Sequence, residues 1–133
     1  MKTQILDFQK LKKFDEGKRH LETLWADEHS TVKLICMKPG QEITTHTHHG
    51  NHIWVVLEGR AEFLSSDKET QVLDIGKIVI VPTLVENGIR NACGDNLVLA
   101  SITASGDCAG HHESIQKSRR SVSLGRRVQG AGA

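Results

Sequence analysis

The chain has 133 residues, of which 38% are hydrophobic and 25% charged, and its formal net charge is +1. At roughly 100 to 200 residues per domain this length allows one domain, and the composition excludes a wholly disordered chain. No apolar run approaches the roughly 20 residues that span a bilayer. Residues 1–13 mix lysines and acids where a signal peptide needs an apolar core. We therefore expect a globular cytoplasmic protein without a membrane partner.

Cysteine spacing and charge distribution exclude further classes of protein. Cys36, Cys93 and Cys108 form no close-spaced pair, so we expect free thiols rather than a disulfide framework or a cysteine zinc site. Residues 114–133 contain five basic and no acidic side chains, which leaves residues 1–113 acidic. A basic tail on an acidic body differs from the basic folded face that tracks phosphates, and tyrosine is absent. We therefore expect no nucleic-acid partner.

Residues 1–20 carry scattered apolar side chains among lysines and predict an N-terminal arm, either a short helix or an extended segment. From residue 21 onward, short runs rich in Val, Ile, Leu and Thr alternate with turn signals about every ten residues, which is typical of an all-β sandwich or barrel. The predicted strands are 21–26, 31–38, 42–48, 52–58, 60–65, 69–74, 77–82, 87–92 and 96–104.

The turn residues support this division of the chain. Pro39-Gly40 suits a type II turn, and Glu58-Gly59 separates two strand candidates where a tight turn needs glycine at positive φ. Residues 105–133, rich in Gly, Ser and Arg, predict a poorly ordered tail. The alternative is an arm that becomes ordered on a partner subunit. One β-domain over residues 21–104 follows.

Four of the eight histidines fall within residues 46–52. On one strand, His46 and His48 point to the same face, because strand side chains alternate with period 2. If residues 49–51 form a hairpin loop, with its glycine or asparagine left-handed, His48 and His52 become cross-strand neighbours with Cβ atoms roughly 5 Å apart. Three converging imidazoles predict a divalent transition-metal site. The alternative is a surface hairpin without a ligand.

The same residues resemble the first motif of the cupins. The sequence GQEITTHTHHGNHIWVVLEG, residues 40–59, has a glycine, five residues, His-x-His, a ligand position and a closing glycine. The ligand position is His52, where most cupins have Glu. Residues 76–91, GKIVIVPTLVENGIRN, resemble the second motif, with Asn87 at the place of the family's remaining ligating histidine.

This resemblance covers about residues 21–104 and implies an RmlC-like jelly-roll β-barrel of two antiparallel sheets, with the metal inside and frequently a homodimer. The metal ligands that it implies are His46, His48 and His52, with Asn87 as a weak fourth ligand or a hydrogen-bond donor. The fold alone does not choose the reaction, because it hosts oxygenases, isomerases, lyases and binding proteins.

The neutral donor set indicates a strong Lewis acid, since no ligand cancels the charge of the ion. Such a site favours small, oxygen-rich organic anions. Iron would indicate a dioxygenase, and Mn, Zn, Ni or Co a lyase or isomerase; the ligands alone do not select the metal. Period 2 places Trp54 inward, as a substrate platform or a core residue, and Asn91 on the face of Asn87, as a second substrate-binding candidate. Glu86 points away unless a bulge turns it inward.

Two functions of different classes therefore remain open. The first is a metal-dependent enzyme acting on a small organic anion. The second is a non-catalytic ligand-binding or metal-sensing module, which is favoured by Asn87 in the place of a histidine, by the absence of an obvious general base and by the basic tail.

Overall fold

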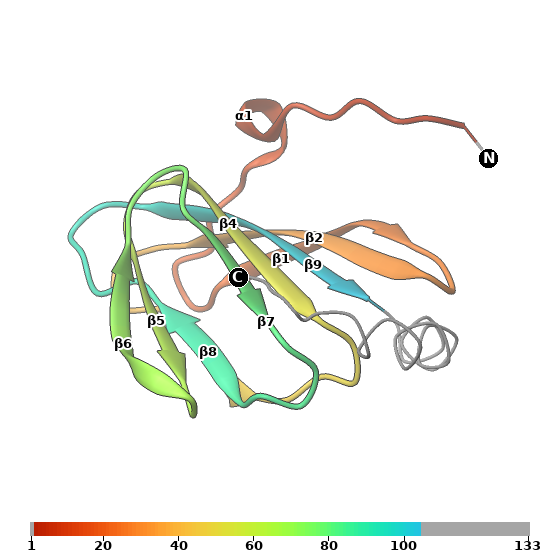
Figure 1. The fold of residues 1–133 in the computed structure, drawn as a ribbon. Helices are drawn as coiled ribbons and strands as arrows, with labels where there is room; N and C mark the ends of the chain where they lie inside the picture. Colours follow the sequence, from red (N-terminus) through yellow and green to blue (C-terminus); the bar gives the residue numbers. More distant parts are fainter. Residues whose placement is uncertain (1, 105–133) are drawn as a thin grey trace, which may run out of the picture.

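Two antiparallel sheets face each other and form a flattened barrel (Figure 1). The computed structural model describes residues 2–104, so the predicted tail, 105–133, lies outside the described residues. One sheet has five strands in the order β1-β2-β9-β4-β7, and the other has four in the order β3-β8-β5-β6. The predicted all-β, RmlC-like jelly-roll architecture is confirmed.

The elements follow the sequence pattern closely. They are α1 (Phe8–Leu11), β1 (His20–Ala26), β2 (Ser30–Met37), β3 (Glu42–His46), β4 (His52–Glu58), β5 (Ala61–Ser65), β6 (Lys68–Leu73), β7 (Ile78–Val81), β8 (Asn87–Arg90) and β9 (Leu97–Ala104). Every predicted strand is present, with bounds that differ by two residues or fewer. Gly40 and Gly59 have φ of +88° and +85°, which confirms the left-handed turn positions.

The main hydrophobic core lies between the sheets. It is formed by side chains from both layers, with Ile35, Met37, Ile43, Trp54, Val56, Ala61, Phe63, Leu73, Val81, Ile89, Leu97 and Leu99 all buried. Along β4 the alternating residues His52, Trp54 and Val56 are buried on this inner face, as period 2 predicts. The inner face of the five-stranded sheet therefore carries both core and candidate site residues.

The N-terminal arm covers the outer face of the same sheet. Leu34, Cys36 and Val98 are buried there and pack against apolar side chains that include Phe8, Leu11, Phe14, Leu24 and Leu57. The short helix α1 lies over this face (Figure 1), and Asp7 caps it by accepting a hydrogen bond from the Gln9 amide. The predicted arm thus contains one turn of helix and seals the outside of the barrel.

The connection from β3 to β4 differs from the predicted hairpin. β3 ends at His46 and pairs with β8, whereas β4 lies in the other sheet between β7 and β9. Residues 47–51 therefore cross between the layers, and His48 and His52 are not cross-strand neighbours. The hairpin prediction was wrong because local spacing resembles a tight turn, whereas the pairing of a strand depends on distant segments.

Candidate metal centre

His46 closes strand β3, where its Cα lies opposite Asn87 of β8. Its Nδ1–H donates to the Thr44 carbonyl at 2.8 Å. Because a carbonyl oxygen can only accept, this bond fixes the proton on Nδ1 and leaves a lone pair on Nε2, which accepts a hydrogen bond from His48 Nε2 at 2.8 Å. A backbone carbonyl that orients a histidine in this way is a common outer partner of metal-binding imidazoles.

His48 lies in the crossover loop, which the segment after β7 holds in place. Its carbonyl accepts hydrogen bonds from the Leu84 amide at 2.8 Å and from the Thr83 hydroxyl at 3.2 Å. Gly50 permits a close approach of β9, because a Cβ there would lie 1.7 Å from the Ala104 carbonyl oxygen. Neither Gly50 nor its neighbour Asn51 has positive φ, so the predicted left-handed residue was wrong and the glycine is needed for space.

His52 opens strand β4 with its Cα between Val81 of β7 and Thr103 of β9. Only 3% of the residue is exposed. Its Nε2 hydrogen-bonds with the Ser101 hydroxyl at 2.7 Å, whereas its Nδ1 is buried without a hydrogen-bond partner among the described residues. The Trp54 ring stacks on this imidazole, with ring centroids 4.1 Å apart. The ring is therefore tightly positioned yet keeps one unsatisfied nitrogen.

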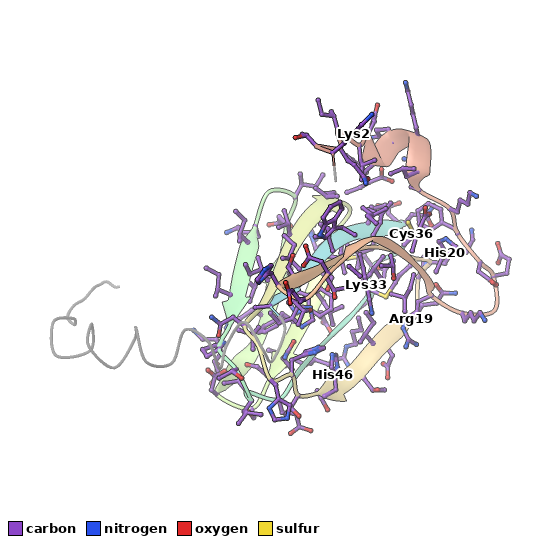
Figure 2. The ribbon with its side chains drawn as sticks, turned by 90° about the vertical axis from the view of Figure 1, so that its right-hand side faces the viewer. Lys2, Arg19, His20, Lys33, Cys36 and His46 are labelled. Atoms are coloured by element: carbon purple, nitrogen blue, oxygen red, sulfur yellow. The ribbon has the colours of Figure 1, made fainter. Side chains whose placement is uncertain are left out.

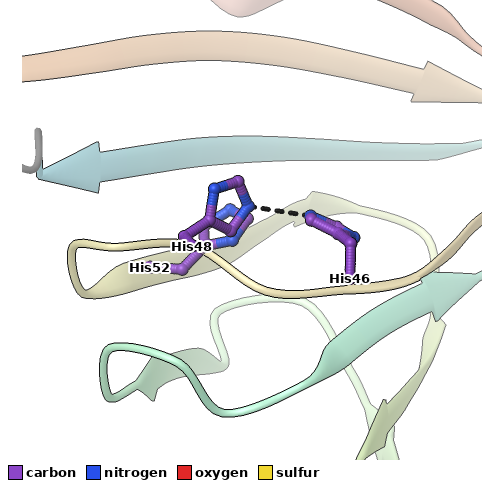
Figure 3. Close-up of side chains that lie close together, drawn as sticks. All are labelled: His46, His48 and His52. Atoms are coloured by element: carbon purple, nitrogen blue, oxygen red, sulfur yellow. Dashed lines mark hydrogen bonds between the residues drawn. The ribbon is translucent and has the colours of Figure 1, made fainter.

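These three imidazoles come together between the two layers (Figure 3). One nitrogen from each ring lies within 4.8 Å of the others, and His46 Nε2 lies 2.8 Å from His48 Nε2. Nitrogen atoms that bind one ion at about 2.0–2.1 Å and at right angles are about 3 Å apart, so the 2.8 Å separation of the His46 and His48 nitrogens suits shared coordination. Neutral imidazole nitrogens are the donors that divalent transition metals accept, so the chemistry of this donor set fits such an ion. The predicted convergence is confirmed.

Burial favours the neutral form of two of these rings, His48 and His52. Burial lowers the pKa of His52 to about 3, and the charges of neighbouring basic groups add to this effect. Burial also lowers the pKa of His48, with smaller contributions from His46 and from the positive charge of Lys33. Since metal binding requires neutral imidazole, little free energy is needed at pH 7 to prepare either ring.

The histidines line a cavity of about 330 Å³. Apolar walls come from both sheets, and the polar or basic lining includes several residues that sequence reasoning had missed, namely Arg19, Lys33, Thr44, Ser101 and Thr103. No carboxylate is among the described residues that line it. Lys33 could have been recognised from period 2, because it shares the inward face of β2 with Ile35 and Met37.

Trp54 and Asn87 form a buried pair beside the cavity. The indole Nε1–H donates to Asn87 Oδ1 at 3.0 Å, and Asn87 Nδ2 donates to the Val85 carbonyl at 3.1 Å. Trp54 lines the cavity, whereas Asn87 is not among the described lining residues. Trp54, the predicted substrate platform, therefore lies beside the histidines, whereas Asn87 contacts Trp54 without lining the cavity.

The remaining sequence candidates lie elsewhere. Asn91 is 1% exposed, and its amide nitrogen donates to the carbonyls of Met37 and Asp95 at 3.1 and 2.8 Å. Its carbonyl oxygen accepts from the Cys93 amide at 3.2 Å, so the side chain organises the turn before β9. Glu86 is exposed, directly before β8. The structure brings neither residue to the cavity wall.

Comparison with known families agrees with this geometry. A family profile described as "Cupin domain" matches residues 33–103, which is more than half of the chain. The chain belongs to the cupin family. Its matched segment includes the complete histidine cluster, so this cupin has three histidines that could hold a metal ion. No curated protein sequence matched the chain.

Solved structures give the same fold. A Thermus thermophilus protein is 24% identical, with a TM-score of 0.73, 77% of this chain and 98% of that chain covered. A Klebsiella pneumoniae protein with a double-stranded β-helix domain is 25% identical, with a TM-score of 0.73 and coverages of 80% and 94%. The DMSP lyase DddQ from Ruegeria pomeroyi is 19% identical, with a TM-score of 0.60 and coverages of 66% and 47%. Within residues 2–104, no helix is both long and apolar enough to cross a bilayer.

Proposed function

We propose that this cupin is a metal-dependent enzyme that acts on a small, oxygen-rich organic anion. The observation that carries the proposal is the meeting of three histidine nitrogens within 4.8 Å of one another at a cavity of about 330 Å³. His46, His48 and His52 would be the ligands. A divalent ion held by these neutral donors would supply a Lewis acid that polarises the oxygen atoms of a chelating anion.

The residues around the histidines have distinct roles in this proposal. The Thr44 carbonyl and the Ser101 hydroxyl orient the imidazoles of His46 and His52 through hydrogen bonds of 2.8 and 2.7 Å. Trp54 provides an apolar wall beside the ligands and limits the access of water. Such outer contacts fix ligand geometry and therefore support metal affinity.

Asn87 has two proposed roles, as a weak fourth ligand or as a positioning residue for Trp54. The second has the better support, because its carbonyl oxygen already accepts the Trp54 indole N–H at 3.0 Å. The substrate-binding role of Asn91 rests only on the strand face that period 2 gives it together with Asn87. The reaction type follows from the metal: iron would favour a dioxygenase, and Mn, Zn, Ni or Co a lyase or isomerase.

A non-catalytic ligand-binding module is the second candidate function. One observation favours it: no described residue that lines the cavity carries a carboxylate that could act as a general base. The two functions differ in turnover, because a binding module would retain its metal and its ligand unchanged.

The assembly is a further part of the proposal, and we expect a cytoplasmic homodimer. Ile78 and Ile80 on the edge strand β7 are 64% and 67% exposed, which supports a partner on this edge. Sedimentation at the monomer mass at micromolar concentrations would contradict the dimer.

The decisive test is the metal content of protein purified without a polyhistidine tag, measured by plasma mass spectrometry. The unaltered protein should carry close to one ion per chain, and His48→Ala should lose most of it. His49→Ala is the matched control, because His49 is exposed in the same loop and should leave the metal content unchanged. Equal metal content in His48→Ala and the unaltered protein would refute the assignment. The identity of the metal then selects the substrates and oxidants to assay.

A further inference from the structure

The cavity contains two basic side chains that the ligand set does not use. We propose that Lys33 and Arg19 bind a carboxylate group away from the metal, so that the substrate is a short dicarboxylate or a dicarboxylate with an added oxo or hydroxy group. This inference rests on the proposed function, since it assigns the second end of a molecule whose first end binds the metal.

Lys33 stands on the inward face of the five-stranded sheet. Its Cα is paired with Ser101 of β9, and Ser101 is paired in turn with Trp54 of β4. Directly opposed side chains of neighbouring antiparallel strands have Cβ atoms about 5 Å apart. Lys33 is therefore one strand away from Ser101, whose hydroxyl bonds His52. Its charge also contributes to the lowered pKa of His48 and His52, after the larger effect of burial.

Neither basic group has an ion-pair partner among the described residues. Lys12, Lys38, Arg60 and Arg90 pair with Glu58, Glu16, Asp74 and Glu62, whereas the other lysines without an ion pair in residues 2–104 are exposed. Lys33 is nevertheless half-buried, and no described residue that lines the cavity is acidic. An anionic ligand in this cavity would give Lys33 the charge-assisted hydrogen bond that no described side chain supplies.

Arg19 and Lys33 lie at different depths. Arg19 is exposed and directly precedes β1, whereas Lys33 lies within β2 (Figure 2). Both line the cavity that holds the histidines. Arg19 can therefore attract an anion at the mouth, and Lys33 can bind its carboxylate farther in.

The size of the cavity limits the ligand. Its volume of about 330 Å³ equals that of about eleven water molecules at roughly 30 Å³ each, which suits a molecule of a few carbon atoms. The two basic side chains and a divalent ion together favour two negative charges over one. A monocarboxylate of the same size would leave one cationic group without an anionic partner. The protein should therefore bind a dicarboxylate more tightly than a monocarboxylate of the same size.

The test is calorimetric titration of the zinc-loaded full-length protein with malonate, succinate and glutarate, each beside its monoamide. The monoamide keeps the size and removes one charge. At low ionic strength the best diacid should bind about ten- to a hundredfold more tightly than its monoamide, as expected for one charge-assisted hydrogen bond. Lys33→Met should reduce this preference about tenfold or more, and Arg19→Gln should reduce it less. Lys68→Met, on β6 of the other sheet, is the charge-matched control and should leave it unchanged.

Metal content measured on the same samples separates this inference from the proposed function. Full zinc content with an unchanged preference for the diacid in Lys33→Met would overturn the inference and leave the metal site intact. Unaltered protein that fails to retain zinc would overturn the proposed function, and the substrate assignment with it. Equal binding of every diacid and its monoamide by zinc-loaded protein would also overturn the inference. Full zinc content with a preference lost only on removal of the cavity charges would support it.

Discussion

The two faces of the five-stranded sheet differ in what they contribute to the protein. The outer face contributes buried apolar contacts, and the inner face carries both the main core and the cavity. On the outer face, Leu34, Cys36 and Val98 pack against the N-terminal arm and contribute only burial. On the inner face, the neighbouring residues of the same strands include Lys33 and Ser101, which line the cavity. Successive residues of β2 therefore have different roles, because each step of one residue changes the face. Leu34 contributes to the stability of the fold, whereas its neighbour Lys33 lines the cavity. Substitutions on the two faces should accordingly have separable effects.

The largest effect on stability should come from the outer face. Leu34→Ala removes a side chain that is 2% exposed and should lower the free energy of unfolding by about 3 kcal/mol. Metal content should be unchanged, because the cavity lies on the opposite face. Chemical denaturation in the presence of a chelator, followed by metal analysis of the folded variant, measures both quantities. A variant that folds but no longer retains metal would show that the two faces are coupled.

On the inner face, His52 should make the free energy of unfolding depend on pH. Because the pKa of His52 is lowered to about 3 in the folded state, the unfolded chain takes up a proton first as the pH falls below its ordinary value of 6.5. Stability is therefore complete above pH 6.5 and should decrease below it, by about 2 kcal/mol at pH 5 in the metal-free protein. Denaturation curves of the unaltered protein and of His52→Asn, both in chelator, measure this contribution. Parallel pH profiles of the two proteins would contradict it.

The smallest effect should lie at the border between core and cavity. Trp54→Phe and Asn87→Ala each break the hydrogen bond between indole and amide, so a double-mutant cycle should give a coupling free energy of about 1 kcal/mol. If Asn87 acts only by positioning Trp54, whose ring stacks on His52, the two variants should change the metal affinity to a similar extent. A loss of affinity confined to Asn87→Ala would instead assign it as a fourth ligand.

The strands could be predicted from the sequence because their signals are local. Alternation within β2 and β4 and the turn glycines Gly40 and Gly59 each depend on a few adjacent residues. The convergence of the histidines was also predicted, although the hairpin that was expected to produce it does not form. The inward position of His52 was predicted correctly despite the wrong connection, because His52 and Trp54 are two residues apart on one strand and therefore share a face.

The rest of the site depends on pairings between distant segments. Ser101 reaches His52 only because β9 is paired with β4, and Arg19 reaches the cavity only because β1 is paired with β2. Thr83 and Leu84 hold the carbonyl of His48 across more than thirty residues of sequence. None of these contacts leaves a local pattern, whereas the inward position of Lys33 does and could have been found.

The crossing of residues 47–51 between the layers has a mechanical consequence. His46 belongs to the four-stranded sheet and His52 to the five-stranded sheet, and no backbone pairing joins β3 to β4. A ligand that binds both imidazoles would therefore link the two sheets at this end of the barrel. The interstrand hydrogen bonds do not provide this link, because they join strands only within each sheet. The relative motion of the two sheets at this end of the barrel would then decrease when the site is occupied and increase when it is empty.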